Sequence, residues 1–112
     1  MSVMLGKLIE GDGPPPKGAG LLPITGITED SRQVRPGFLF AALPGVKIDG
    51  ARFIPQAVNA GAAAVLCLPG VTVPAPAVIV ADGNPRRMLA RMAARFSGAQ
   101  PDLVVAVTGT NG

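Results

Sequence analysis

The chain has 112 residues, a net charge of +3 and hydrophobic residues at 48% of its positions, which suits one compact globular domain. It contains no histidine and a single cysteine, Cys67, so the usual zinc ligands, an internal disulfide and a Cys–His nucleophile are excluded. No apolar run reaches the ~18 residues of a membrane span, and the N-terminus lacks a basic-then-apolar signal, so we expect a soluble, cytoplasmic protein. The mild positive charge suits an anionic ligand such as a nucleotide and is too small to indicate nucleic acid.

The first predicted element is a short helix over residues 3–9, followed by a loop over residues 11–20 that holds three consecutive prolines. Residues 24–28 alternate in the way that predicts a strand. A turn at Arg35-Pro36-Gly37 then leads into a second predicted strand, residues 38–42. We expect these two strands to lie in one sheet.

Helices and short apolar strands alternate in the next part of the chain. Apolar residues at helical spacing predict a helix from Phe53 to Gly61, with Pro55 in its first turn and glycine as the stop. Strands are predicted over residues 63–68 and 77–81. Cys67 falls in the first of these strands and is expected to be a small buried hydrophobe.

A longer helix is predicted to begin with Asn84 as N-cap and Pro85 at its first position, to run to about Ser97 and to close at Gly98. One of its faces is apolar, and its two methionines are expected to fill the core. A stripe of arginines, residues 87, 91 and 95, follows another face. The stripe allows phosphate or nucleic-acid binding, and the alternative is a solvated surface whose arginines cover apolar neighbours.

Residues 103–107 form a last apolar run after a linker. The element order is strand, strand, helix, strand, strand, helix, strand, which predicts an α/β fold with a small mixed sheet flanked by helices. We expect a helix and Pro/Gly-rich loop over residues 1–20 and a ligand-binding domain over 21–99. Residues 100–112 would be a linker and the first strand of a following domain.

The last apolar run leads directly into Thr108-Gly109-Thr110-Asn111-Gly112, the order in which a strand precedes a phosphate-binding loop. Glycines let backbone N–H groups face phosphate oxygens, and a lysine and a hydroxyl residue would have to follow to complete the loop. The alternative is a turn after an ordinary strand. We expect this chain alone to bind nucleoside triphosphate weakly or not at all.

A second ligand hypothesis concerns Glu29-Asp30-Ser31-Arg32, which follows the first strand at the edge of the sheet. The Ser31 hydroxyl suits a uracil carbonyl or a phosphate, and the Arg32 fork suits an anion. Alternatively, Asp30 and Ser31 organise a turn and Arg32 pairs with a carboxylate. The Gly45–Gly50 loop offers backbone amides to the same ligand, or is a glycine-hinged connection.

Several motifs occur in a fixed order: Asp-Ser-Arg-x-Val-x-Pro-Gly-x-Leu-Phe over 30–40, Gly-x-x-x-Asp-Gly over 45–50, Gly61-Ala62, and Val-Thr-Gly-Thr-Asn-Gly over 107–112. This series resembles the N-terminal part of a Mur ligase, with its Rossmann-like N-terminal domain, over about residues 22–112. Within the family it is most similar to the MurE type, which uses ATP to add the third residue, diaminopimelate or lysine, to UDP-MurNAc-L-Ala-D-Glu in peptidoglycan synthesis. The MurF type shares much of the early pattern, and a stand-alone, non-catalytic UDP-sugar-binding module is the remaining alternative.

The resemblance implies a role for each matching segment. The first strand's end and the glycine loop would bind the UDP end of the substrate, through Glu29, Ser31, Val46, Lys47 and Ile48. The last segment would begin the ATP loop, through Gly109, Thr110, Asn111 and Gly112. ATP and Mg²⁺ are implied for the full-length enzyme, with none bound to this chain alone, and no catalytic residue or metal ligand is assigned here. The implied partners are UDP-MurNAc-L-Ala-D-Glu and the central and C-terminal domains of the same chain, in a monomer without nucleic-acid or membrane contacts.

Overall fold

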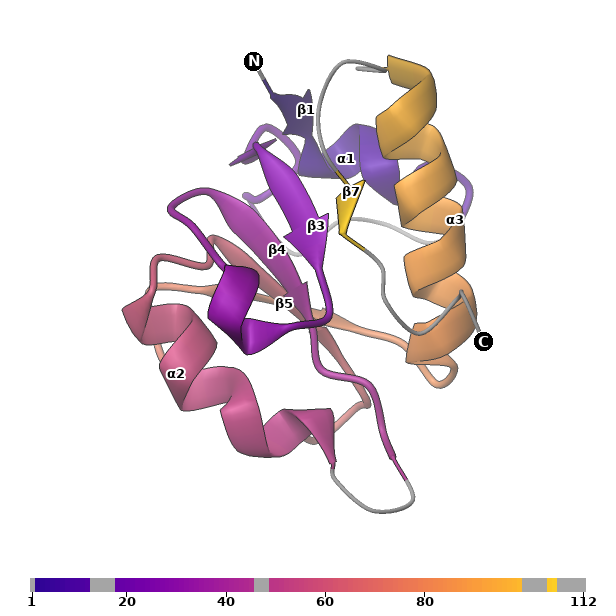
Figure 1. Ribbon diagram of the computed structural model, residues 1–112. Coiled ribbons are helices and arrows are strands. Elements are labelled where there is room, and N and C mark those ends of the chain that lie inside the picture. The colour runs from indigo at the N-terminus through magenta and orange to yellow at the C-terminus, as the bar shows by residue number, and fades with distance from the viewer. Residues whose placement is uncertain (1, 13–17, 46–48, 100–104, 107–112) are drawn as a thin grey trace.

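The computed structural model describes residues 2–12, 18–45, 49–99 and 105–106. Its centre is a five-stranded sheet of order β6-β5-β4-β3-β7, in which every neighbouring pair is parallel. Helices α1 and α3 cover one face of this sheet and α2 covers the other (Figure 1). The strands are β3 (Gly26–Thr28), β4 (Phe38–Ala41), β5 (Ala64–Cys67), β6 (Val78–Ala81) and β7 (Val105–Ala106).

The predicted α/β fold is confirmed, and so is the predicted order of the elements from β3 onward. The expectation of a mixed sheet is wrong, because every neighbouring pair in the main sheet is parallel. The two strands expected to share a sheet do so, because β3 pairs with β4 and Ile27 lies opposite Leu39. Within the described residues, antiparallel pairing occurs only in a separate two-stranded sheet of β1 (Val3–Met4) and β2 (Pro23–Ile24). β7 continues the main sheet beside β3, and the proposed domain division near residue 100 stays a prediction.

The expectation of one strand over residues 24–28 is wrong, because the chain changes sheets at Thr25. Ile24 pairs in the small sheet, whereas the Thr25 amide donates to the Gly37 carbonyl at 3.0 Å and leads into β3. Gly26 makes this junction possible, since a Cβ there would lie 2.4 Å from the ring of Phe38. Sheet membership is therefore decided by partners distant in sequence.

Alternate residues of each central strand enter different cores, as the two-residue period of a strand requires. Leu39 and Leu66 pack toward α1 (Leu5–Leu8) and α3 (Pro85–Ala99), while Phe40 and Val65 pack toward α2 (Ile54–Asn59). Cys67 is fully buried in the core between the sheet and α2, as predicted, and burial raises the pKa of its thiol. The sheet is thus covered on both faces, which is usual for parallel sheets.

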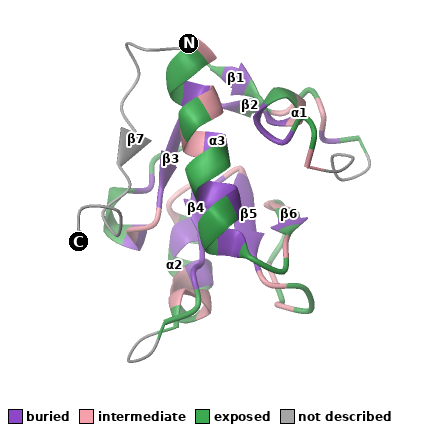
Figure 2. Cartoon of the chain, turned by 90° about the vertical axis from the view of Figure 1, so that its right-hand side faces the viewer, coloured by how far each residue is buried: buried purple, intermediate pink, exposed green. Residues whose placement is uncertain are grey.

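The predicted start of α3 is confirmed, because the Asn84 side chain accepts a hydrogen bond from the Arg87 amide at 3.2 Å and Pro85 is the first helical residue. Its two methionines are buried, as expected. The predicted stop at Gly98 is wrong, since the helix continues to Ala99. Figure 2 shows α3 in front of the sheet, with exposed residues on its outward face.

The first predicted helix, residues 3–9, is helical over Leu5–Leu8 only, because Val3 and Met4 belong to β1. The helix around Phe53 divides into a 3-10 turn, η2 (Gly50–Phe53), and α2, with Pro55 in the first turn as predicted. Gly61 follows α2 with φ +106°, the left-handed conformation that favours glycine, which confirms its role as the stop.

The arginine stripe of α3 is not uniformly solvated. Arg87 is exposed, but Arg91 and Arg95 both pair with Asp12 in the loop after α1. Arg95 also donates to the Leu8 carbonyl at 2.7 Å. The expected solvated surface holds for Arg87 and for the exposed Arg91, whereas Arg95 is partly buried; Arg91 and Arg95 in addition attach the N-terminal segment to α3.

None of the described helices is both long and apolar enough to span a membrane.

Candidate functional site

The strand order places a topological switch point beside β3. β4, β5 and β6 follow one another on one side of β3, and β7, which follows α3, lies on the other side. Open parallel sheets bind ligands at the carboxyl ends of the strands at such a point. Here that position is the end of β3, where Thr28 and Glu29 lie.

The turn after β3 is organised by Asp30. Its carboxylate accepts a hydrogen bond from the Arg32 amide at 2.9 Å and caps the 3-10 helix η1 (Ser31–Gln33). The Arg32 guanidinium also binds it through Nε at 3.0 Å and Nη2 at 2.9 Å. This fork lowers the pKa of Asp30 and raises that of Arg32. The alternative that Asp30 organises a turn and Arg32 pairs with a carboxylate is confirmed, so the Arg32 fork is already engaged.

Thr28 and Ser31 are the buried polar residues of this turn. The Thr28 hydroxyl accepts a hydrogen bond from the Asp30 amide at 3.0 Å, which fixes the chain direction as it leaves β3. Ser31 retains 9% of its surface and does not line the pocket described next. The structure therefore places Ser31 at the start of η1, two residues after Glu29 and outside the lining of the pocket.

A pocket of about 230 Å³ lies at the carboxyl ends of β3 and β4. Glu29 contributes to it directly after β3, and Arg86 contributes from the first turn of α3. The remaining wall is formed by Leu43-Pro44-Gly45 after β4 and by Gly50 and Phe53 of η2. Four segments thus meet at the position where the topology predicts a ligand.

Both ends of the glycine loop are anchored at this pocket. The Gly50 amide donates to the Leu43 carbonyl at 2.8 Å, and a Cβ at position 50 would lie 2.6 Å from the Leu43 nitrogen. Asp49 accepts a hydrogen bond from the Ala51 amide at 3.1 Å and caps η2. Val46, Lys47 and Ile48, the predicted contacts between these anchors, lie outside the described residues.

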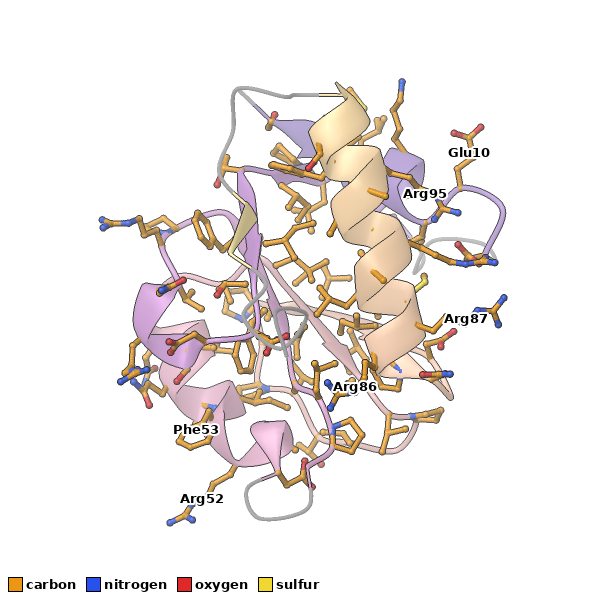
Figure 3. The ribbon with its side chains drawn as sticks, turned by 45° about the vertical axis from the view of Figure 1, so that its right-hand side comes forward. Glu10, Arg52, Phe53, Arg86, Arg87 and Arg95 are labelled. Atoms are coloured by element: carbon orange, nitrogen blue, oxygen red, sulfur yellow. The ribbon has the colours of Figure 1, made fainter. Side chains whose placement is uncertain are left out.

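Arg86 joins α3 to this loop. Its Nη2 donates to the Pro44 carbonyl at 3.3 Å. Figure 3 shows Arg86 extending from the start of α3 toward the loop after β4, whereas Arg87 points to the opposite side of the helix, and both arginines are exposed. Neither Arg86 nor Phe53 was predicted from the sequence to belong to a site. The signal for Arg86 was its place directly after Asn84-Pro85, which puts it in a first helical turn at the carboxyl edge of the sheet.

Two larger pockets lie elsewhere, at the N-terminal segment and the end of α3. One of about 320 Å³ is lined by Lys7, Glu10 and Arg95 among others, and one of about 510 Å³ by Val3, Met4 and Gly20 among others. Neither touches the carboxyl ends of the strands. Because position in an α/β sheet is a better guide to a ligand site than volume, the pocket of Glu29 and Arg86 is the candidate site.

Of the predicted site residues, the structure brings Glu29 into the pocket and places Ser31 in the turn that follows, outside the pocket lining. Gly109, Thr110, Asn111 and Gly112 lie outside the described residues, as does the glycine loop's centre. In the described part of the chain, no group of three or more His, Cys, Asp or Glu side chains converges on a possible metal position.

Residues 23–97 match the Mur ligase family, catalytic domain. Three curated proteins with the name UDP-N-acetylmuramoyl-L-alanyl-D-glutamate–2,6-diaminopimelate ligase are similar in sequence. The Rhizobium meliloti protein is 50% identical over 94 residues, covering 84% of this chain and 19% of its own length. The Bradyrhizobium diazoefficiens protein is 54% identical over 94 residues, covering 81% of this chain and 19% of its own length. The Zymomonas mobilis protein is 45% identical over 108 residues, covering 96% of this chain and 22% of its own length. The chain thus spans about a fifth of these relatives.

Solved structures show the same fold. The UDP-N-acetylmuramoylalanyl-D-glutamyl-2,6-diaminopimelate–D-alanyl-D-alanyl ligase of Acinetobacter baumannii superposes with a TM-score of 0.64 at 22% identity, over 85% of this chain and 21% of that one. The MurF ligase of Thermotoga maritima, solved in complex with ADP, gives a TM-score of 0.54 at 27% identity, over 65% of this chain and 17% of that one.

Proposed function

This chain belongs to the Mur ligase family, and from that membership we propose that it is the substrate-binding N-terminal domain of an ATP-dependent amino-acid ligase of peptidoglycan synthesis. The complete enzyme would add the third peptide residue to UDP-MurNAc-L-Ala-D-Glu in the cytoplasm. Its central and C-terminal domains would follow in the same chain, and it would act as a monomer.

The choice of MurE type over MurF type rests on sequence likeness. Relatives at 45% to 54% identity carry the name of the diaminopimelate-adding ligase. The likeness to MurF structures is weaker, at 22% to 27% identity. The same names favour diaminopimelate over lysine as the added residue, a choice that the sequence motifs left open.

The observation that carries the proposal is the pocket at the switch point, with Glu29 in its wall. In this position a carboxylate accepts hydrogen bonds from the N–H or O–H groups of a bound nucleotide. The Ser31 hydroxyl, in the adjacent turn, and the backbone of the glycine loop would supply further contacts. The proposed substrate-binding residues are Glu29, Ser31, Val46, Lys47 and Ile48.

ATP would bind beyond the carboxyl end of β7. Because β7 lies beside β3, its carboxyl end points toward the same edge of the sheet. We propose that Gly109, Thr110, Asn111 and Gly112 begin the ATP loop there, with backbone N–H groups facing phosphate oxygens. When bound, ATP with Mg²⁺ supplies the phosphoryl group that activates the substrate carboxylate for attack by the incoming amine. The residues described here bind and orient the UDP end of the substrate, and no catalytic role is proposed for them.

The test is an assay of the protein carrying this sequence at its full native length. The proposal predicts ATP-dependent formation of UDP-MurNAc-tripeptide from UDP-MurNAc-L-Ala-D-Glu and diaminopimelate, detected by mass spectrometry, with much less product when lysine replaces diaminopimelate. A matched reaction offers UDP-MurNAc-tripeptide and D-Ala-D-Ala. Product in this second reaction alone would assign the chain to the MurF type and contradict the proposal.

A further inference from the structure

Two arginines lie near the carboxyl edge of the sheet at β3, and the structure separates their roles. The Asp30 carboxylate binds the Arg32 guanidinium along one edge, through Nε and Nη2, and the Arg32 side chain is 82% exposed. Arg32 does not line the pocket, whereas Arg86 does. Arg86 is therefore the arginine with access to a ligand at this site.

The Arg86 guanidinium has donors to spare. Within the described residues its one hydrogen bond is that to the Pro44 carbonyl at 3.3 Å. A guanidinium carries several N–H donors in a planar fork, which suits the oxygens of a phosphate. The bond to Pro44 orients the fork and uses Nη2, so the other N–H groups keep their capacity to donate to a ligand.

The charges in the pocket also determine the orientation of an anionic ligand. Among the described residues, Glu29 and Arg86 are the charged ones that line it. A diphosphate is repelled by the carboxylate and attracted by the guanidinium, so it lies on the α3 side, with uncharged N–H or O–H groups toward Glu29. The N-terminus of α3 adds positive potential on the same side, because Arg86 is the second residue of that helix.

We propose that Arg86 is a substrate-binding residue whose guanidinium, oriented by the Pro44 carbonyl, binds the diphosphate of the nucleotide sugar. The inference rests on the proposed function, since it needs a UDP-linked substrate in this pocket. It extends that function by naming the residue that recognises the charged part of the ligand. The sequence motif alone suggested Arg32 for this role, and the structure favours Arg86.

The test compares wild type with Arg86→Gln, Arg86→Ala and Arg87→Gln in the full-length protein. Gln at position 86 keeps a donor for Pro44 and removes the charge. Arg87→Gln is the matched control, because Arg87 is the neighbouring arginine of the same turn and points away from the pocket. Dissociation constants are measured by calorimetry or NMR for UDP-MurNAc-L-Ala-D-Glu, UDP and uridine, after amide spectra confirm that each variant is folded.

Both Arg86 variants are expected to bind the two diphosphate ligands about tenfold more weakly or worse, as loss of a charged hydrogen bond implies. Uridine binding is expected to change less than about twofold, and Arg87→Gln is expected to match wild type. The difference between wild type and Arg86→Gln should shrink with added salt.

The outcomes separate the two proposals. Tight binding of UDP-MurNAc-L-Ala-D-Glu by both wild type and Arg86→Gln would overturn the role of Arg86 and leave the proposed function intact. An equal loss of affinity for uridine in the Arg86 variants would also overturn it, and so would an equal loss of affinity for the diphosphate ligands in Arg87→Gln. In either case the effect would not depend on contact between Arg86 and the diphosphate. Absence of binding by the wild-type protein would overturn both.

Discussion

The carboxylate of Asp12 lies 2.7 Å from Nη1 of Arg95, which ties the loop after α1 to the C-terminal half of α3. Arg91 binds the other oxygen of the same carboxylate, and Arg95 also donates to the Leu8 carbonyl. One acidic side chain therefore connects the N-terminal segment to the helix that covers the main sheet. This attachment lies away from the candidate site, so its predicted effects concern stability.

Replacing Asp12 by Asn should loosen the N-terminal segment. Without its charge, position 12 no longer pairs with Arg91 and Arg95, so local opening becomes easier. Amide hydrogen exchange at Leu5, Gly6 and Ile9 is expected to quicken, while that of β4 and β5 stays unchanged. Glu10→Gln is the control, because Glu10 makes no ion pair within the described residues. Equal protection in Asp12→Asn and wild type would show that the ion pairs do not hold the segment.

Stability should fall at acidic pH. The hydrogen bond from Arg95, followed by the interactions with Arg91, holds the pKa of Asp12 below its ordinary value of 3.8, and Arg32 does the same for Asp30. A lowered folded-state pKa contributes stability that is present above the ordinary pKa and is lost as the pH falls through the folded value. The melting temperature is therefore expected to drop on acidification below about pH 4.

The Asp12→Asn variant provides the check on this pH dependence. It lacks one of the two depressed carboxyl groups, so its melting temperature should fall less steeply over the same range. Thermal unfolding of both proteins, measured by circular dichroism between pH 2.5 and 6, would show whether Asp12 contributes to the pH dependence. Parallel curves for the variant and wild type would contradict the assignment to Asp12.

Two glycines should respond to alanine with opposite signs. Gly61 has φ +106°, and a Cβ there would lie 2.8 Å from the Pro36 Cα, so Gly61→Ala should destabilise by about 1–2 kcal/mol or more. Gly98 lies within α3 and a Cβ there meets no atom within 4 Å, so Gly98→Ala should stabilise by about 0.5–1 kcal/mol. Urea unfolding measures both, and a shared sign would contradict the helix end and the turn described here.

Phe96 anchors α3 to the sheet. Its side chain is fully buried in the core shared with Leu39 and Leu66. Phe96→Ala should cost about 3–5 kcal/mol, a large part of the about 5–15 kcal/mol that stabilises an ordinary domain. Ser97→Ala, at the adjacent exposed position, should change the unfolding free energy little. A small loss for Phe96→Ala in urea unfolding would mean that α3 does not pack as described.

Local patterns predicted the features that depend on neighbouring residues. The Asn84-Pro85 start of α3 and the pairing of Asp30 with Arg32 were both foreseeable, because each forms within a few residues. The order of the elements also followed from local periodicity. These features need no knowledge of the tertiary structure.

Features that join distant segments were not foreseeable in this way. Arg91 and Asp12 are 79 positions apart, so the arginine stripe looked like a solvated surface. Arg86 meets the Pro44 carbonyl across 42 positions, and no pattern in either segment indicates the other. The change of sheets at Thr25 depends on pairing with β1 and β4. In each case the contact forms only when α3 packs on the sheet or when the strands pair, so the sequence around either residue does not indicate its partner.

The most direct test of the central claim is a titration of the ¹⁵N-labelled chain with UDP-MurNAc-L-Ala-D-Glu, followed by amide NMR. The account predicts saturable shifts at Glu29, Ser31, Gly45, Gly50 and Arg86, around the pocket at the carboxyl ends of β3 and β4. Shifts confined to Lys7, Gly20 and Ala99, beside the pockets of the N-terminal segment, would contradict it, as would no shifts at millimolar ligand.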